Sequence, residues 1–351
     1  MTKVYVGMSG GVDSSLSASL LKEQGYDVVG VYMKNWSRDL PGMKCPWAED
    51  LSDAKRVAVQ LEIPFKVFDF EKEYKHLVVD YMLREYKLGR TPNPDIMCNK
   101  EVKFGLFLKA ALEDGADKIA TGHYAQVSSE NLLKAKDENK DQTYFLYRIT
   151  KEAVKKTLFP IGNLTKPEVR EEAKKRGLLT ANRRESQGIC FVGNIGIKDF
   201  LSEFIEAKPG NIIEQETNKN VGVHDGAIFY TFGQRHNLGV GGGMPYYVVG
   251  KDMKSNEVYV SHNLNNEKFW QKTLKLSDIH WINKEPILNK KYQVRLRHRG
   301  RLIDCKIISK DFKTLLLELE QSERAIAPGQ SAVLYDENIV LGGGIVTVVE
   351  N

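Results

Sequence analysis

The stretch VYVGMSGGVDSS, residues 4–15, contains three local signals that decide the fold of the first half of the chain. The apolar residues before the glycines predict a strand, and leucines at helical spacing after Ser15 predict a helix that stops at Gly25. Between them, Gly10 and Gly11 allow consecutive amides to turn inward as an anion-binding nest beside the start of that helix. The stretch therefore predicts a strand–loop–helix unit that binds phosphate.

This loop does not follow the two common nucleotide-binding patterns. The pattern G-x-x-x-x-G-K-[ST] is absent, together with its lysine, and so is G-x-G-x-x-G. The plainer explanation is a glycine turn that only joins a strand to a helix. Three hydroxyls, from Ser9, Ser14 and Ser15, favour phosphate binding over that explanation.

Strand and helix signals alternate along the first half of the chain. Apolar runs predict strands at residues 4–8, 28–33, 65–70 and 118–122. Amphipathic runs predict helices at residues 14–24, 48–61, 74–86 and 100–113, and Pro167 and Gly177 mark the two ends of another. This alternation predicts an α/β domain, a doubly wound parallel sheet with helices on both faces.

After about residue 205 the pattern changes to short strands. Runs of β-branched and aromatic residues between Gly, Asn and Asp turns predict antiparallel strands in IFYTFG, YYVVGKD, EVYVS, YQVRLRHRG, CKIISKD, TLLLELE, SAVLY and GIVTVV. We therefore expect the α/β domain at residues 1–205, a small central β-rich domain at 206–270 and a β-barrel at 271–351.

The composition is that of an ordinary globular protein of two or three domains, with 351 residues, 42% hydrophobic and 28% charged. A formal charge of +5 suits nucleic acid but is also common among enzymes. No apolar run approaches a membrane span, and the first strand begins at about Lys3, which leaves no room for a signal peptide. Four cysteines without a C-x-x-C pair argue against a zinc knuckle and against a dense disulfide scaffold, which favours a reducing cytoplasm. We therefore expect a cytoplasmic protein, and the lack of a long apolar run predicts no membrane partner.

Two of the four cysteines lie in unusual surroundings. Cys98 follows two prolines in RTPNPDIMCNKEVKFG, near a predicted helix start and the basic Lys100 and Lys103, which favours its thiolate form. Cys190 lies in RRESQGICFVG, in a predicted apolar strand. The alternative for each is a small buried hydrophobic residue, the commonest state of a free cysteine. Cys45 and Cys305 are expected to be structural.

The stretch SGGVDSS resembles the loop of the PP-loop ATPases, which use ATP to adenylate a carbonyl or carboxylate. The resemblance implies that the loop holds departing pyrophosphate, and that Asp13 helps to place Mg²⁺. It also places adenosine near Met33 and Gly122, at strand ends that would otherwise be read as core and turn. The implied ATP-binding residues are Gly7, Met8, Ser9, Gly10, Gly11, Val12, Asp13, Ser14, Met33 and Gly122.

A second resemblance covers residues 4 to about 335. The motifs MSGGVDSS, GRTPNPDIMCNKEVKFG, ATGHYA, KDQTYFLY, SQGICFVG, YTFGQRHNLGVGGG and APGQSAVLY occur in the order seen in the bacterial and mitochondrial tRNA 2-thiouridylases. These enzymes replace the 2-oxygen of the wobble uridine in the anticodon loop by sulfur. The resemblance implies that Cys190 accepts sulfur as a persulfide from a donor protein, a cysteine desulfurase or sulfur relay protein. Cys98 would then act as partner nucleophile and close a Cys98–Cys190 disulfide.

The same resemblance implies the RNA contacts. Asn93, Pro94 and Asp95 would contact the target base, and Lys140, Asp141, Gln142, His123, Arg297, His298 and Gln330 would contact the tRNA. Strand alternation in YQVRLRHRGR also places Arg295, Arg297 and Arg299 on one predicted face, which is either solvated surface or a backbone-binding surface. One departure is Asn237, where the family usually has glycine; asparagine tolerates left-handed backbone angles, so we expect the turn to survive.

Three alternatives share some of these features. An amide-forming PP-loop ligase would share the loop but needs neither two reactive cysteines nor a β-rich second half. A non-catalytic RNA-binding protein could keep the loop as scaffold. A PP-loop enzyme that thiolates another tRNA position often carries a cysteine-bound iron–sulfur cluster, which four scattered cysteines do not supply.

Overall fold

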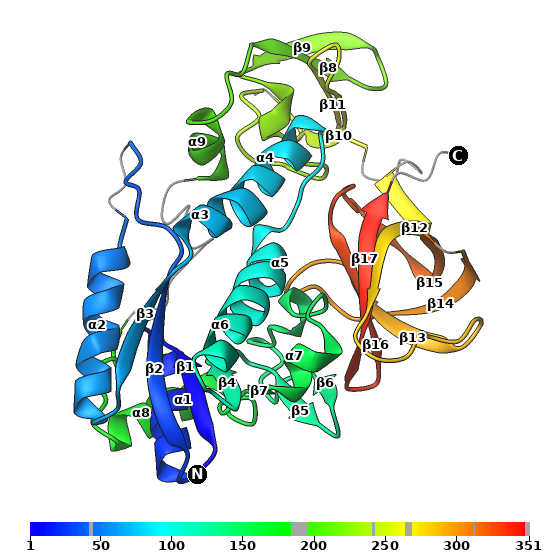
Figure 1. Ribbon diagram of the computed structural model, residues 1–351. Coiled ribbons are helices and arrows are strands. Elements are labelled where there is room, and N and C mark those ends of the chain that lie inside the picture. The colour runs from blue at the N-terminus through cyan, green and yellow to red at the C-terminus, as the bar shows by residue number, and fades with distance from the viewer. Residues whose placement is uncertain (42–44, 184–195, 241–242, 264–268, 312, 348–351) are drawn as a thin grey trace.

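The computed structural model describes residues 1–41, 45–183, 196–240, 243–263, 269–311 and 313–347. Within these residues the strands form three sheets, and Figure 1 shows them in separate regions of the molecule, with most helices around the first. A parallel α/β part, a small part that mixes parallel and antiparallel strand pairs, and a closed barrel follow one another along the chain. This confirms the predicted fold class.

The first sheet is parallel and five-stranded. Its order is β3 (Phe65–Asp69), β2 (Asp27–Lys34), β1 (Lys3–Gly7), β4 (Lys118–Thr121) and β7 (Thr157–Leu158). The order reverses direction between β1 and β4, and in open sheets of this kind ligands bind outside the carboxyl ends of the strands at such a point. The loop after β1 therefore lies where a ligand is expected.

Helices cover both faces of this sheet because its central strand is apolar on both sides. Val4 and Val6 pack with α1 (Val12–Glu23) and α2 (Trp47–Gln60), whereas Tyr5 points into the cluster on the opposite face. The other helices are α3 (Glu71–Tyr74), α4 (Asp80–Lys87), α5 (Pro94–Met97), α6 (Phe107–Glu113), α7 (Lys151–Lys155), α8 (Lys166–Lys175) and α9 (Ile197–Ser202). Two predicted helices are interrupted by π-helical segments, η1 (Lys75–Val79) and η2 (Cys98–Leu106).

The central sheet has the order β10 (Tyr247–Asp252), β11 (Glu257–Ser261), β8 (Gly210–Glu214) and β9 (Lys219–His224). The antiparallel pairing predicted here holds for β10 with β11 and for β8 with β9, but β11 runs parallel to β8. The predicted strand in IFYTFG is wrong. Its first part belongs to the 3-10 helix η4 (Ala227–Phe229), and Thr231 to Gln234 close a turn in which Gly233 has φ +83°. Apolar side chains of this run are buried in the core although their backbone forms a turn. Their spacing in the sequence therefore resembles that of a strand.

The last sheet closes on itself. Its ring is β12 (Trp270–Trp281), β15 (Thr314–Arg324), β14 (Ile303–Lys310), β13 (Lys291–Arg295), β16 (Ser331–Asp336) and β17 (Ile339–Thr347), and β17 pairs back with β12. A hairpin of the first half, β5 (Gln126–Ser128) and β6 (Asn131–Leu133), joins this sheet through the pair Ile339 and Leu133. The barrel is thus tied by a strand ladder to the α/β part.

Candidate functional site

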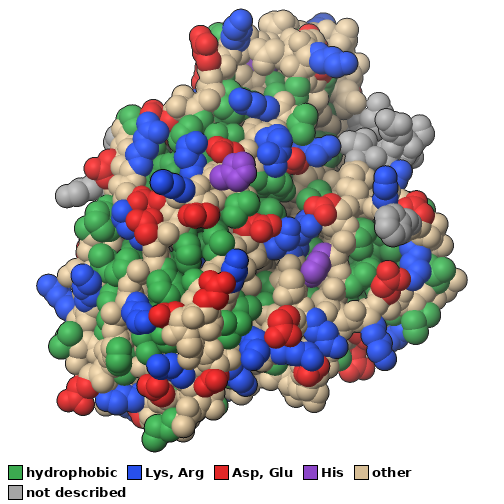
Figure 2. Space-filling view, in the orientation of Figure 1, with side chains coloured by type: hydrophobic (Ala, Val, Ile, Leu, Met, Phe, Trp, Pro, Cys, Tyr) green, Lys and Arg blue, Asp and Glu red, His purple; other side chains and the backbone are tan. Residues whose placement is uncertain are grey.

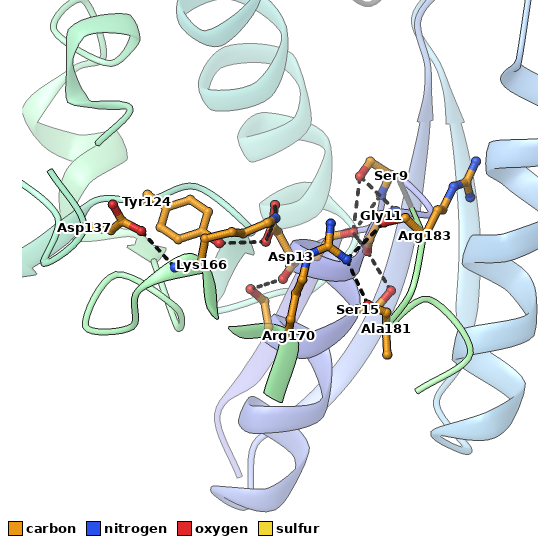
Figure 3. Close-up of polar contacts among 12 residues, drawn as sticks. Ser9, Gly11, Asp13, Ser15, Tyr124, Asp137, Lys166, Arg170, Ala181 and Arg183 are labelled. Atoms are coloured by element: carbon orange, nitrogen blue, oxygen red, sulfur yellow. Dashed lines mark hydrogen bonds and ion pairs between the residues drawn. The ribbon is translucent and has the colours of Figure 1, made fainter. Parts of the chain in front are cut away.

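The phosphate-binding loop predicted after β1 is tightly enclosed by backbone (Figure 3). Gly10 has φ +75°, and a Cβ on it would lie 2.5 Å from the Asp50 carbonyl oxygen. A Cβ on Gly122, just after β4, would lie 2.7 Å from the backbone nitrogen of Ser14. Only glycine fits at either position without a shift of the backbone. Gly10 therefore lets the loop pack against α2, and Gly122 lets the end of β4 pack against the start of α1.

The loop hydroxyls are turned toward the loop's own backbone. Ser14 Oγ accepts from the Ser9 amide (3.1 Å) and donates to the Gly11 carbonyl (3.2 Å), and Ser15 Oγ donates to the same carbonyl (2.8 Å). Ser14 and Ser15 are buried. These serines therefore fix the shape of the loop, so the predicted binding of an anion would fall to the backbone amides and the start of α1.

The predicted adenosine-binding residues lie beside the loop at the same sheet edge. Met33, near the end of β2, reaches toward β1, because its Cε would lie 2.9 Å from a Cβ on Gly7. Met8 is buried, and its amide donates to the Val31 carbonyl (2.7 Å). The strand order β2, β1, β4 thus brings Met33, the loop and Gly122 together.

Asp13, the residue predicted to place Mg²⁺, is held by partners from distant segments. The Lys166 ammonium donates to both Asp13 carboxylate oxygens, at 2.7 and 2.8 Å, and the Tyr124 hydroxyl donates to Oδ1 at 2.9 Å. Lys166 is the first residue of α8, and Figure 3 shows its side chain directed at Asp13. No local pattern identifies this lysine as a partner of the loop, because it lies 153 positions from Asp13 along the chain.

A second cation contacts the loop from outside. Arg183 donates to the Gly10 carbonyl (2.9 Å) and to Asp50 on α2 (2.6 Å), and it also pairs with Asp53. Burial raises the pKa of Asp50, although the Arg183 guanidinium opposes this shift. Arg183 therefore ties the loop to α2.

Cys190 lies outside the described residues, because the described segment 45–183 ends at Arg183. The position of Cys190 relative to Cys98 therefore stays a prediction.

The helix that carries Cys98 begins earlier than predicted. Asn93 caps α5, since its Oδ1 accepts from the amides of Asp95 (3.1 Å) and Ile96 (3.4 Å), and Pro94 occupies the first turn. Because this cap fixes the start, Cys98 lies one turn inside a continuous helix and is buried at 3% exposure. Burial also raises the pKa of the Asp95 carboxyl, with Lys103 opposing it.

His123 connects the loop region to the helix of Cys98. Its Nδ1 lies 2.8 Å from Thr121 Oγ1, and its ring lies 5.6 Å from that of Phe104, which belongs to η2. Burial lowers the pKa of His123 well below its usual value, so the ring is neutral at pH 7. Burial also raises the pKa of the Cys45 thiol. It raises the pKa of the Cys305 thiol to about 12, and both shifts disfavour the reactive thiolate, in keeping with the structural role expected of these cysteines.

The segment 140–142, predicted to contact tRNA, lies at the seam between the α/β part and the barrel. Asp141 forms an ion pair with Arg295 at 2.6 Å, and their side chains are only 1% and 8% exposed. The Gln142 amide oxygen accepts from the Tyr124 backbone amide (2.9 Å), next to the hydroxyl-bearing ring that contacts Asp13. Gln330 donates to the Thr91 carbonyl (3.3 Å). All three residues hold parts of the structure together.

The predicted basic strand face is wrong. β13 ends at Arg295, which points inward to Asp141, and the chain then turns, with Gly300 N–H donating to the Arg297 carbonyl (2.9 Å) and Arg299 at φ +58°. The turn breaks the alternation. Arg297 remains 64% exposed near Glu323, and the His298 ring lies 4.4 Å from that of Phe145. On the face drawn in Figure 2, basic side chains are interspersed with acidic ones.

Asn237 takes φ +60°, as predicted for the position where asparagine stands in place of glycine. No helix among the described residues is long and apolar enough to cross a membrane. Likewise, the described residues contain no group of three or more His, Cys, Asp or Glu side chains that could hold a metal ion by themselves.

Comparison with known proteins covers the whole chain. Residues 2–194 match the model described as the tRNA methyl transferase HUP domain, 198–262 the tRNA methyl transferase PRC-barrel domain, and 271–346 the aminomethyltransferase beta-barrel domain. The chain is 46% identical to the tRNA-specific 2-thiouridylase MnmA of Oceanobacillus iheyensis, covering 100% of the chain and 96% of that protein. It is 48% identical to the MnmA of Legionella pneumophila strain Lens, covering 98% of both.

Proposed function

The chain belongs to the tRNA-specific 2-thiouridylase MnmA family, and from this membership we propose that it exchanges the 2-oxygen of the wobble uridine in tRNA for sulfur, using ATP. The observation that carries the proposal is the identity of 46% over the entire chain. The glycine loop at the sheet's switch point supports it, because adenylation requires a site that holds ATP phosphates. A ligase acting on a small carboxylate would explain the loop but not the full-length match.

The first step makes the uridine oxygen a leaving group. The 2-oxygen of the base attacks the α-phosphorus of ATP, a new P–O bond forms, and pyrophosphate departs. The loop from Gly7 to Ser14 would hold the departing pyrophosphate with its amides, and Met33 and Gly122 would flank the adenosine. Mg²⁺ commonly binds through one or two carboxylates together with substrate phosphates, so a single carboxylate, Asp13, fits the ion, which would neutralise phosphate charge there.

The second step delivers sulfur. A donor protein loads Cys190 as a persulfide; the Cys98 thiolate then attacks the Cys190 sulfur, a Cys98–Cys190 disulfide forms, and the terminal sulfur leaves as hydrosulfide. Hydrosulfide attacks C2 of the activated base, and the oxygen departs with AMP. The two cysteines end oxidised, so a thiol reductant must reopen their disulfide before another turnover. Because Cys98 is buried, we infer that its segment must open for this exchange.

The remaining assignments follow the family membership. We propose that Asn93, Pro94 and Asp95 contact the base, and that Lys140, Asp141, Gln142, His123, Arg297, His298 and Gln330 line or support the tRNA-binding surface. Of these, Arg297 is the exposed cation, whereas Asp141 and His123 are buried and would act by holding the surface in place. We place the protein in the cytoplasm, and keep residues 1–205, 206–270 and 271–351 as its proposed domains.

The test is nucleoside analysis. Mass spectrometry of nucleosides from tRNA incubated with the protein, Mg-ATP and a persulfide-loading donor should reveal 2-thiouridine, with one AMP formed for each. Cys98→Ser and Cys190→Ser should abolish the product with donor-supplied sulfur, while Cys305→Ala, at a buried barrel cysteine, should retain it. If folded wild-type protein consumes ATP without forming 2-thiouridine, the proposal fails.

A further inference from the structure

The glycine loop contains no cation of its own, yet the structure brings one to it from α8. We propose that Lys166 serves as the lysine that this loop lacks, and supplies the positive charge with which the loop holds pyrophosphate. The proposal rests on the proposed function, because it takes the residues from Gly7 to Ser14 to be the phosphate site.

The backbone of Lys166 is fixed by its surroundings. Thr165 and Glu168 form a capping box at the start of α8, in which the Thr165 amide donates to Glu168 Oε2 at 2.6 Å. The Lys166 amide itself donates to Asp137 Oδ2 at 2.8 Å. These bonds hold the start of the helix, and they therefore fix the backbone position from which the Lys166 side chain extends.

The helix α8 is also fixed relative to the loop. Val169 and Ala173 of α8 pack against Val12 and Leu16 of α1 in one buried cluster. Since α1 begins directly after the glycines, this packing sets the distance between the ammonium and the loop. Figure 3 shows Lys166 approaching Asp13 beside the loop residues Ser9 and Gly11.

The charge balance explains why the lysine is needed. Asp13 lies in the first turn of α1, where an isolated carboxylate would repel a bound polyanion. The Lys166 ammonium, on a side chain only 10% exposed, neutralises that carboxylate, so the loop amides can act on the anion unopposed. If Asp13 were to hold Mg²⁺, the positive charge of Lys166 would be left for the phosphates. A Walker lysine supplies the same charge from within its own loop.

A purely structural role is the competing explanation, in which Lys166 only joins α8 to α1. The two roles differ in what they predict for the anion. If Lys166 were only a structural tie, its loss would weaken the binding of every ligand of the site and lower the stability of the protein. If it supplies charge, its loss weakens the binding of pyrophosphate and leaves the binding of neutral adenosine unaffected.

The experiment measures binding of magnesium pyrophosphate and of adenosine to full-length variants by calorimetry, alongside their melting temperatures. Lys166→Gln should weaken pyrophosphate binding by about tenfold or more, as expected for loss of a charge-assisted contact. Adenosine binding should change by less than about twofold, within the scatter of such measurements. Lys166→Arg should retain most of the pyrophosphate affinity, and Lys175→Gln, at an exposed lysine of the same helix, should resemble wild type.

A second variant keeps the proposal testable if Lys166→Gln does not fold. Asp13→Asn removes the carboxylate and keeps the lysine, so in EDTA it should bind metal-free pyrophosphate more tightly than wild type. Unchanged pyrophosphate affinity in Lys166→Gln, equal losses for adenosine and pyrophosphate, or weaker metal-free binding in Asp13→Asn would each overturn the proposal. These measurements need no tRNA, so they can succeed even if 2-thiouridine is never formed.

Discussion

Four histidines in the described part of the chain sit where their charged form is disfavoured. Burial is the leading cause that lowers the pKa of His123, His224, His280 and His298. At His298 the nearby Arg299 and Arg295 add to the effect. His280 and His298 lie at the seam between the α/β part and the barrel, and His123 lies beside the glycine loop. The region proposed to bind tRNA and ATP therefore contains imidazole rings that favour the neutral form.

The neutral His123 leads to a prediction about acid. Its pKa is lowered on folding, so below about pH 6.5 the unfolded chain binds a proton that the folded chain does not. The free energy of unfolding should therefore fall as the pH drops from 7.5 to 5.5. The slope of this fall measures the protons taken up on unfolding, and His123→Gln should reduce that number by up to about one. Urea unfolding across this pH range measures it, with His76→Gln, at a histidine 81% exposed, as control. Equal slopes in wild type and His123→Gln would contradict the prediction.

Helices, strands and turns could be predicted where a local sequence pattern marks them, whereas contacts between distant segments could not. The strands β1 to β4 and the helices around them follow hydrophobic period, and the glycine loop follows from backbone freedom at Gly10, so both were predictable. β8, β9 and β12 were not predicted, because their exposed positions weaken the pattern. The contacts of Lys166 and Arg183 depend on how α8 packs on α1, which no local pattern encodes.

The cap of α5 gives a prediction at this scale. Asn93→Ala removes the acceptor for the Asp95 and Ile96 amides, which should destabilise the helix start by about 1 kcal/mol. Both amides should then exchange with solvent about fivefold faster. Hydrogen exchange with residue resolution measures this, and Asn93→Asp, which keeps an acceptor, should resemble wild type. Unchanged exchange in Asn93→Ala would mean that the cap does not hold the segment leading to Cys98.

Over the whole molecule, one segment fastens the barrel to the α/β part. The Tyr144 hydroxyl donates to the Ser331 carbonyl (3.0 Å), and the Tyr147 hydroxyl lies 3.1 Å from Ser331 Oγ. Arg148 binds both carboxylate oxygens of Asp278 on β12, at 2.6 and 2.8 Å. Since Gln142 of the same segment contacts Tyr124, whose hydroxyl contacts Asp13, a chain of hydrogen bonds links the seam to the glycine loop.

The buried ion pair of this seam should control the docking of the barrel. Arg295→Met leaves the Asp141 carboxylate buried without its cation, which should cost about 3–5 kcal/mol. Adding Asp141→Asn, which removes the charge but keeps an acceptor for the Ala135 amide and the Thr143 hydroxyl, should recover most of the loss. Arg301→Met removes a cation that is 59% exposed and leaves Arg297 3.8 Å from Glu323, so it should cost at most about 1 kcal/mol. Urea unfolding followed by tryptophan fluorescence compares the three variants. Equal stability of Arg295→Met and Arg301→Met would show that hydrogen bonds and packing hold the barrel in place without this pair.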